Sequence, residues 1–245
     1  MLRFLKKRPS TSSLPYCSAV VVAAGRSTRM EGMDKILALL DGMPVLAHTL
    51  LALEQCSSIH EIIVVTKEDA LVPVGQLCKT YGIEKASHVI VGGNTRVESV
   101  FSGLRTVSSK AKLIAIQDGA RPFITKELVA AVVQKASICG AAAPAVPVHD
   151  TIKTFSSDLF TGTLNRSSLL AVQTPQVFDA SLIKGAIQKA LEEQWPITDD
   201  CSAVEQLGMQ VSWVDGLAEN IKITTRADLA MAEGICAWKR EELMV

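Results

Sequence analysis

The feature of this sequence that most constrains its fold is a regular alternation of short apolar runs with longer amphipathic segments. Ser18 to Ala24 is a continuous apolar run, which is typical of a strand covered on both faces of a sheet. Similar runs predict strands over residues 61–66, 88–91, 113–117 and 210–214. Because strands separated by helices of about ten to fifteen residues favour a parallel sheet, we expect an α/β fold: a single-domain, Rossmann-like, mostly parallel doubly wound sheet.

Helices are expected in the intervals, and several begin at recognisable capping residues. Pro44 suits the first turn of a helix that extends to about residue 55, and Thr95 with Glu98 forms the pattern of a capping box. Thr125 and Asp179 are expected to cap two further helices, the second over residues 180–192. The remaining helices are predicted over residues 70–81, 199–207 and from 226 onward.

The alternation loosens after Ala141. Residues 149–154 and 159–164 have the pattern of short strands with a polar loop between them. They predict a β-arm at about 148–172 that protrudes from the sheet and serves in dimerisation. Because the sequence contains neither an internal repeat nor a low-complexity linker, residues 18–245 are expected to form one domain.

Composition excludes several classes of protein. Of the 245 residues, 48% are apolar and 20% are charged, which excludes a disordered chain. The 25 Lys and Arg residues balance the 25 Asp and Glu residues, so no overall field would attract nucleic acid or an anionic membrane, and no run approaches the ~20 apolar residues of a membrane span. The six cysteines lack the close spacings of metal or redox motifs, so we expect them to pack as small core residues.

The first thirty residues contain no acidic residue and begin with a basic cluster. One interpretation is an export signal or an organelle transit sequence. The other, which we favour, is a solvated basic tail over residues 1–17, because the following apolar run ends in Gly25 and basic residues rather than at a small-residue cleavage site. We therefore expect a bacterial-type cytoplasmic protein, with plastid import left open.

Four of the predicted strands end in polar segments, where open parallel sheets bind their ligands. These segments are residues 25–35, 66–67, 92–94 and 118–121. In the first, Gly25 lets backbone amides approach a phosphate, and Arg26, Arg29 and Lys35 add the positive charge that a polyphosphate requires. The Walker and dinucleotide glycine patterns are both missing, so a solvated basic turn is the alternative for this loop; a tight turn and a helix cap are the alternatives for Gly93 and Asp118.

The motifs are more specific when they are taken together. Ala23-Ala24-Gly25 through Arg29-Met30 to Lys35 resembles the signature of the sugar-phosphate nucleotidyltransferases. Within that group, the chain is similar to the 2-C-methyl-D-erythritol 4-phosphate cytidylyltransferase family. The further matches run in order over nearly the whole chain: Gly92-Gly93-Asn94-Thr95-Arg96 with Ser99, Asp118-Gly119-Ala120-Arg121-Pro122, Asp150-Thr151-Ile152-Lys153, Asn165-Arg166, Gln173-Thr174-Pro175-Gln176, Thr198-Asp199-Asp200 with Ser202-Ala203, and Glu219-Asn220-Ile221-Lys222-Ile223-Thr224.

The resemblance implies transfer of CMP from CTP to 2-C-methyl-D-erythritol 4-phosphate with release of pyrophosphate, in non-mevalonate isoprenoid biosynthesis. The acceptor is already an anionic phosphate, so no Ser, Cys or His nucleophile and no strong base is needed. The difficulty is to bring two anions together and to stabilise the charge that builds on the α-phosphate, so positioning and electrostatics should supply most of the rate. A divalent cation, Mg²⁺, is expected to be held mainly by the CTP phosphates.

The resemblance also implies roles for individual residues. The catalytic residues are expected to be Arg29, Lys35, Arg166 and Lys222. Contacts to the base and ribose of CTP are expected at Ala23, Ala24, Gly25, Gly93, Asn94 and Ser99. Further substrate contacts, mainly to the sugar phosphate, are expected at Asp118, Gly119, Arg121, Thr151 and Thr174. In the family, the arginine that matches Arg166 comes from the β-arm of the partner subunit, which implies a homodimeric site.

Some positions depart from the commonest family pattern. Ser27 stands where a second glycine is frequent, which predicts a stiffer loop. Asp34 replaces the usual proline before Lys35, so an acid is expected to weaken the field of a catalytic cation. Asn94 sits where an acid is common.

Two other functions stay open. A ribitol 5-phosphate cytidylyltransferase would share the CTP half of the site, although Ala23-Ala24-Gly25 rather than an Ala-Gly-Gly form favours the methylerythritol family. A non-catalytic nucleotide-binding subunit is the other alternative, and cations aimed at the α-phosphate argue against it.

Overall fold

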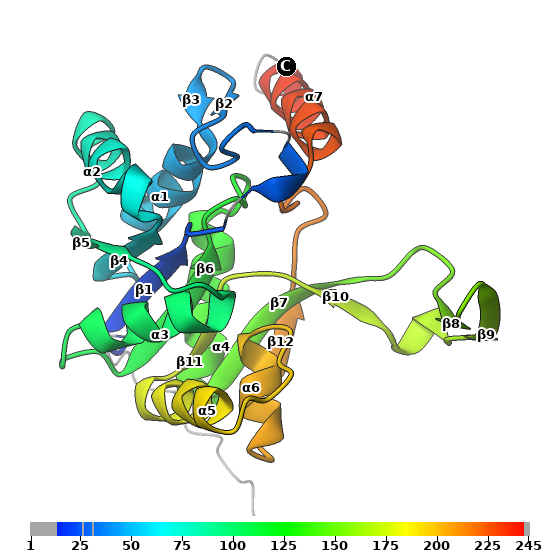
Figure 1. Ribbon diagram of the computed structural model, residues 1–245. Coiled ribbons are helices and arrows are strands. Elements are labelled where there is room, and N and C mark those ends of the chain that lie inside the picture. The colour runs from blue at the N-terminus through cyan, green and yellow to red at the C-terminus, as the bar shows by residue number, and fades with distance from the viewer. Residues whose placement is uncertain (1–13, 26, 31, 243–245) are drawn as a thin grey trace, which may run out of the picture.

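The computed structural model describes residues 14–25, 27–30 and 32–242 (Figure 1). Its central sheet has the strand order β10-β7-β11-β6-β1-β4-β5, and β12 also pairs with β7. These strands are β1 (Cys17–Val22), β4 (Glu61–Thr66), β5 (Ala86–Val91), β6 (Leu113–Asp118), β7 (Ala141–Pro147), β10 (Leu170–Val172), β11 (Gln176–Asp179) and β12 (Ser212–Asp215). β11 and β10 run antiparallel to their neighbours, and the other pairs are parallel, so the predicted mostly parallel sheet is confirmed.

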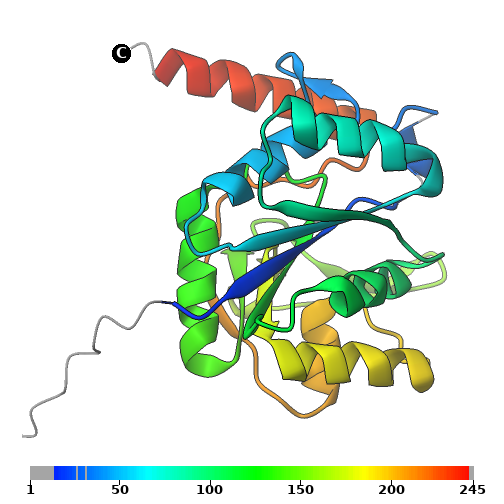
Figure 2. The ribbon, with the colours of Figure 1, turned by 90° about the vertical axis from the view of Figure 1, so that its left-hand side faces the viewer.

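Helices cover both faces of this sheet (Figure 2). One face packs against α1 (Val45–Gln55), α2 (Leu71–Thr80) and α4 (Lys126–Cys139), and the other against α3 (Arg96–Thr106), α5 (Ala180–Glu192) and α6 (Asp200–Gln206). Along β1, Ala19 and Val21 point into the first layer while Val20 points into the second. The apolar run of β1 is therefore continuous because both of its faces are buried.

A third, smaller core lies at one end of the sheet. There α7 (Arg226–Glu242) packs Ala232 and Cys236 against Leu40 and Val45, next to the short hairpin of β2 (Leu39–Leu40) and β3 (Met43–Pro44). Among the described residues, none of the helices combines the length and the apolar character that crossing a membrane requires.

Most of the predicted caps are present. The hydroxyl of Thr125 accepts a hydrogen bond from the Leu128 amide, and the carboxylate of Asp179 accepts from the amides at the start of α5, each worth about 1 kcal/mol of stability. The capping box predicted at Thr95 is only half formed, because the Glu98 carboxylate accepts from the Asn94 amide instead of the Thr95 amide. The structure places a complete capping box at the start of α6 instead.

Residues 141–179 differ most from the prediction. The alanine-rich β7 was not predicted, because alanine and proline carry little intrinsic preference for a strand. β10 and β11 were not predicted either, because runs of three and four residues are too short to give a clear pattern. Pairing with β10, β11 and β12 makes β7 a strand, and four of its alanines are buried there. Tertiary pairing therefore decides this region.

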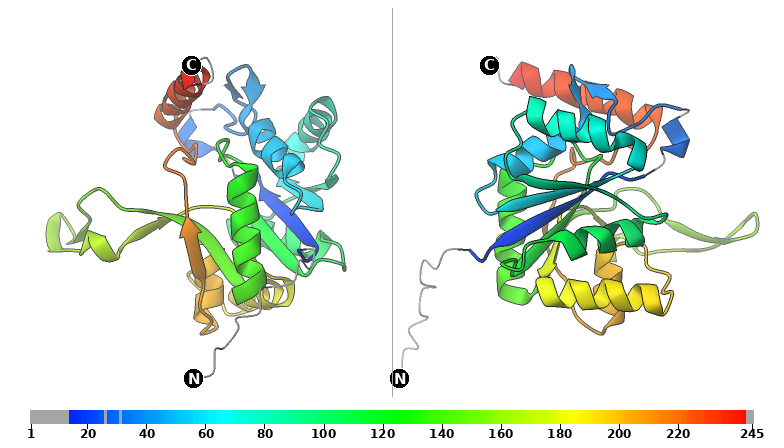
Figure 3. Two further views of the ribbon diagram at one scale, coloured as in Figure 1. Left: turned by 180° about the vertical axis from the view of Figure 1, so that it is seen from behind. Right: turned by 60° about the vertical axis from the view of Figure 1, so that its left-hand side comes forward.

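The predicted β-arm is present as a separate antiparallel pair, β8 (Lys153–Ser156) and β9 (Leu159–Thr163), which projects away from the sheet (Figures 1 and 3). Its first strand begins four residues later than predicted at residue 149. Phe155, Leu159 and Phe160 are exposed on the arm.

Two smaller expectations concern the N-terminus and the cysteines. Most of the predicted basic tail, residues 1–13, lies outside the described residues, and Cys17 already belongs to β1. Five cysteines are buried as expected, but Cys139 is exposed because it lies at the end of α4.

Candidate active site

A cavity of about 530 Å³ lies at the carboxyl ends of β1, β4, β5 and β6. All four of the polar strand exits contribute to its lining, so the expectation that ligands bind at this edge has a physical basis. The polar and glycine residues of the lining are Gly25, Lys35, Thr66, Lys67, Glu68, Gly92, Gly93, Asn94, Thr95, Arg96, Ser99, Asp118 and Lys222. The cavity has the size of a small-molecule site.

Close packing explains the two glycines that follow β5. A Cβ atom on Gly92 would lie 2.6 Å from the Ser99 hydroxyl and 2.7 Å from the Ala24 Cβ, and one on Gly93 would collide with Glu98. Neither glycine has a positive φ. The pair is therefore required by the approach of the backbone to α3, not by a left-handed turn. Ser99 accepts a hydrogen bond from the Gly93 amide at 3.2 Å, which holds this wall of the cavity.

Asp118 is the centre of a charge cluster at the end of β6. Its Oδ2 lies 2.9 Å from Nζ of Lys222 and 3.4 Å from Nε of Arg121, and its Oδ1 lies 3.8 Å from Nε of Arg96. Burial alone would raise the pKa of Asp118, but these cations outweigh burial and hold the pKa below its ordinary value. Asp118 is therefore an anion that aligns three positive side chains.

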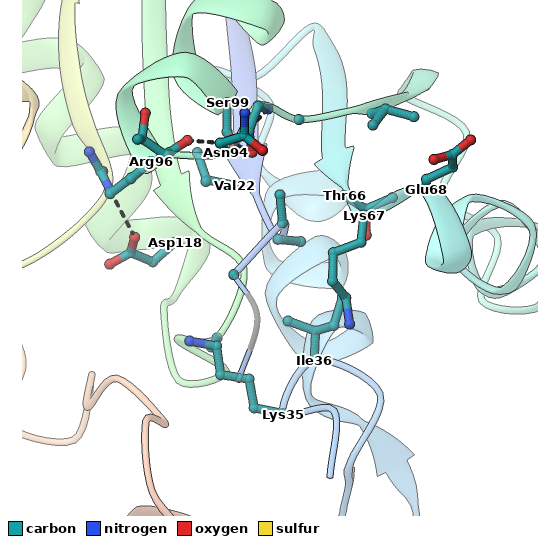
Figure 4. A pocket seen from close by; sticks show the side chains of 18 of the residues that line it. Val22, Lys35, Ile36, Thr66, Lys67, Glu68, Asn94, Arg96, Ser99 and Asp118 are labelled. Atoms are coloured by element: carbon teal, nitrogen blue, oxygen red, sulfur yellow. Dashed lines mark hydrogen bonds and ion pairs between the residues drawn. The ribbon is translucent and has the colours of Figure 1, made fainter. Parts of the chain in front are cut away.

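Arg96 is itself anchored by a second carboxylate. Its two terminal nitrogens donate to both oxygens of Asp200 at 3.0 and 2.6 Å, and Asp200 is fully buried at the start of α6. Burial lowers the pKa of Arg96, but the Asp200 carboxylate more than compensates and raises it. Figure 4 shows Arg96 directed at Asp118 within the cavity. This bidentate pair fixes the guanidinium that faces Asp118.

Lys35 enters the cavity from the loop that follows β1, below Asp118 in the view of Figure 4. Burial lowers the pKa of Lys35, and the positive charges of Lys222 and Arg29 lower it further, while Asp118 and Asp34 oppose the shift. An anion entering the cavity would relieve this repulsion. Lys35 is therefore a cation suited to an anionic ligand.

The loop before Lys35 is held by its own side chains. Ser27 adopts a φ of 51°, in the left-handed region that glycine favours, and its hydroxyl oxygen accepts from the Lys35 amide at 3.3 Å. Asp34 forms an ion pair with Lys67 at 2.7 Å. The acid beside Lys35 thus has a basic partner of its own. Arg29 lies on a short 3₁₀ turn, Thr28–Met30, and is exposed outside the cavity lining.

Behind the cavity, a buried amide network holds the segment that carries Lys222. Asn220 is fully buried and donates to the Thr174 carbonyl at 3.1 Å and to Gln173 at 3.2 Å. The backbone carbonyl of Asn220 accepts a hydrogen bond from Arg121 at 2.6 Å, and the Thr174 hydroxyl accepts one from the Asp118 amide at 3.1 Å. Arg121 and Thr174 therefore brace the charge cluster from behind.

The available donors indicate what kind of metal ion the site could hold. Within the described part of the chain, no three His, Cys, Asp or Glu side chains form a group that could hold a metal. The carboxylates of the lining are Glu68 and Asp118, and Asp118 already faces three cations. Mg²⁺ usually keeps several waters and binds through one or two carboxylates and substrate phosphates. The site therefore fits a cation that enters with a triphosphate.

Comparison with known proteins decides the family. A family model described as IspD, 2-C-methyl-D-erythritol 4-phosphate cytidylyltransferase, matches residues 17–237. The chain belongs to the 2-C-methyl-D-erythritol 4-phosphate cytidylyltransferase family. The resemblance inferred from its motifs is thereby confirmed.

Individual members of this family are similar over most of their length. The 2-C-methyl-D-erythritol 4-phosphate cytidylyltransferase of Halalkalibacterium halodurans is 44% identical over 91% of this chain and 97% of the relative, and that of Syntrophus aciditrophicus is 41% identical over 93% and 98%. The solved structure of 4-diphosphocytidyl-2C-methyl-D-erythritol synthase from Anaerococcus prevotii covers 91% of this chain and 96% of its own, with a TM-score of 0.81 and 30% identity. The cytidylyltransferase from Thermus thermophilus aligns over 90% and 98%, with a TM-score of 0.74 and 31% identity. The chain therefore shares the fold of these cytidylyltransferases over most of its length.

The structure brings most, but not all, of the expected site residues of this cytidylyltransferase family member to the cavity. Those in the lining are Ala23, Ala24, Gly25, Lys35, Gly93, Asn94, Ser99, Asp118 and Lys222. Gly119, Arg121 and Thr174 lie behind it. Thr151 and Arg166 lie on the exposed arm region, where Arg166 donates to the His149 carbonyl at 2.8 Å, and they do not reach the cavity of their own chain.

No individual role was predicted for Arg96, Asp200, Thr66 or Lys67. Arg96 and Asp200 fall in motifs that match the family, but their pairing spans 104 positions, so their spacing gave no signal. Thr66 lines the cavity, and its buried hydroxyl has no hydrogen-bond partner among the described residues.

Proposed function

We propose that this chain transfers CMP from CTP to 2-C-methyl-D-erythritol 4-phosphate, releasing pyrophosphate, as a step of non-mevalonate isoprenoid biosynthesis. Family membership makes it a cytidylyltransferase. The observation that carries the proposal is the cavity itself, where Lys35, Arg96 and Lys222 lie around the ionised carboxylate of Asp118. A cavity rich in fixed cations suits two phosphate-bearing substrates.

The two halves of the cavity would receive the two substrates. The base and ribose of CTP would contact the residues from Gly93 to Ser99 that line the cavity, together with Ala23 and Ala24. The backbone donors and acceptors of these residues can distinguish cytosine. Lys35, assisted by Arg29 from outside the lining, would stabilise the triphosphate. The acceptor phosphate oxygen attacks the α-phosphorus, and the bond to the pyrophosphate oxygen breaks. The chain supplies position and positive charge for this step.

The acceptor sugar phosphate would lie near Asp118, Lys222 and Arg121. The Asp118 carboxylate can accept hydrogen bonds from sugar hydroxyls while it orients Lys222. Mg²⁺, when bound to the CTP phosphates, supplies charge neutralisation and a fixed phosphate geometry. The CTP phosphates would be the main ligands of this Mg²⁺, and few protein residues would contact it.

A homodimer would complete the sugar-phosphate side of the site. Arg166 and Thr151 are exposed on the arm region, and the arm carries exposed Phe155 and Phe160. Burial of such aromatic side chains stabilises subunit contacts. In the dimer that we propose, the arm would reach over the cavity of the partner subunit and place Arg166 there. A bacterial-type cytoplasmic location is part of the same proposal, since the similar proteins named above are bacterial.

We expect the purified chain to release pyrophosphate from CTP with 2-C-methyl-D-erythritol 4-phosphate and not with ribitol 5-phosphate. Chelation of divalent cations should abolish this release, and added Mg²⁺ should restore it, because the triphosphate charge would otherwise stay unneutralised. Pyrophosphate release measured with each acceptor tests both points. Tight CTP binding without turnover on either acceptor would instead indicate a nucleotide-binding subunit.

Replacing Lys222 or Arg166 with alanine should mainly impair use of the sugar phosphate. We expect kcat/KM for 2-C-methyl-D-erythritol 4-phosphate to fall by about a hundredfold, with the Kd for CTP within about twofold of wild type. Steady-state kinetics and calorimetry with CTP separate these quantities. Loss of CTP binding in either variant would move that residue to the nucleotide half of the site.

A further inference from the structure

The segment that precedes Lys35 is tied to the neighbouring strand by an ion pair. Nζ of Lys67, the first residue after β4, lies 2.7 Å from Oδ2 of Asp34. The two side chains are only 24% and 22% exposed. A pair that is partly shielded from water is screened less by salt than a surface pair. It connects the loops that follow two adjacent parallel strands, β1 and β4.

The other oxygen of Asp34 bonds within the segment itself. Oδ1 accepts from the Ile36 amide at 3.3 Å and from the Ser27 hydroxyl at 3.4 Å, while the Ser27 oxygen accepts from the Lys35 amide. One carboxylate therefore links Lys67 to Ser27 and to the backbone amide that follows Lys35. In Figure 4, the Lys67 side chain extends from the end of β4 toward Ile36.

We propose that Asp34 and Lys67 are positioning residues, whose ion pair holds the segment 32–35 so that the Lys35 ammonium is in place before CTP binds. This inference rests on the role of Lys35 in the proposed function. A charge that is already positioned needs no rearrangement when charge develops on the α-phosphate, and is worth more for that reason.

A positioning role and a simple charge effect predict opposite changes in turnover when Asp34 is replaced. If Asp34 acted only as an acid beside Lys35, its removal would strengthen the positive field at the triphosphate and raise turnover. If Asp34 and Lys67 hold the segment, removal of either side chain lets Lys35 move and lowers turnover. The sign of the Asp34→Asn effect therefore separates the two.

The test is a cycle of Asp34→Asn, Lys67→Met and the double variant. We expect each single variant to lower kcat/KM for CTP by about fivefold to tenfold, and the double variant to be no worse than the poorer single variant, because both changes break one interaction. Lys67→Arg should keep most of the wild-type value, since it preserves the charge. Lys189→Met on α5 is the matched control, because it removes a lysine from an exposed ion pair outside the cavity, and it should change nothing.

Limited trypsin digestion reports whether the segment is held in place, and it does not depend on catalytic activity. Cleavage after Arg29 and Lys35 should be faster in Asp34→Asn and Lys67→Met than in wild type, with urea unfolding midpoints equal to that of Lys189→Met. If wild-type protein did not use CTP, the proposed function would fail, while the digestion would still test the positioning. Additive kinetic losses, a gain of turnover in Asp34→Asn, or unchanged cleavage would overturn the inference.

Discussion

Replacing Lys35 with alanine is expected to lower kcat by about a hundredfold or more, the effect of losing one positioned charge donor. Lys35 lines the same cavity as Asp118, and its ammonium is repelled by Lys222 and Arg29 until an anion arrives. Its charge is therefore stabilised most when negative charge builds on the α-phosphate. Single-turnover kinetics with saturating CTP measure the chemical step directly.

Lys35→Arg is the matched variant, because it keeps a cation that does not titrate in the accessible range. In wild type, kcat/KM for CTP should fall at high pH as Lys35 loses its proton, beginning below the ordinary lysine pKa of 10.5, because burial and neighbouring cations lower the pKa of the free protein. In Lys35→Arg, the remaining activity should lose this decline. A Lys35→Ala protein with near-normal turnover would contradict the assigned role.

Replacing Arg96 with methionine should lower the free energy of unfolding at neutral pH by about 3–5 kcal/mol. Asp200 is fully buried, and Arg96 donates to both of its oxygens. Without Arg96, an ionised carboxylate would be left in the interior with no positive partner. Urea denaturation measures the difference.

The pH dependence of this loss identifies its cause. Burial raises the pKa of Asp200, and removal of Arg96 would raise it further, so the folded variant would bind a proton more tightly than the unfolded chain. Its stability should therefore recover as the pH falls from 7 to 5. Arg105→Met, on the same helix but exposed, should cost about 1 kcal/mol or less at either pH. Equal losses in the free energy of unfolding for Arg96→Met and Arg105→Met would refute the prediction.

Several elements could be predicted because their signals are local. The capping oxygen of Asp179 and the apolar stripe that follows specify α5, and the apolar run 61–66 specifies β4 at the observed bounds. The polar strand exits predicted the edge of the sheet at which the cavity lies, and the order of the motifs predicted the family. Both signals come from short segments. For β7, by contrast, the alanine-rich segment carries no local preference, and pairing with three strands makes it part of the sheet.

The amino-acid sequence alone determined where the α-helices and the strands β1, β4, β5, β6 and β12 form, which residues carry positive charge, and which family motifs occur, because each depends on neighbours a few positions apart. Only the tertiary structure decided which charges meet. Arg96 reaches Asp200 across 104 positions, and Lys67 reaches Asp34 across 33. Ion pairs of this kind depend on distances in space. The packing of α3 and α6 on one face of the sheet brings Arg96 to Asp200, and the pairing of β1 with β4 brings Asp34 to Lys67.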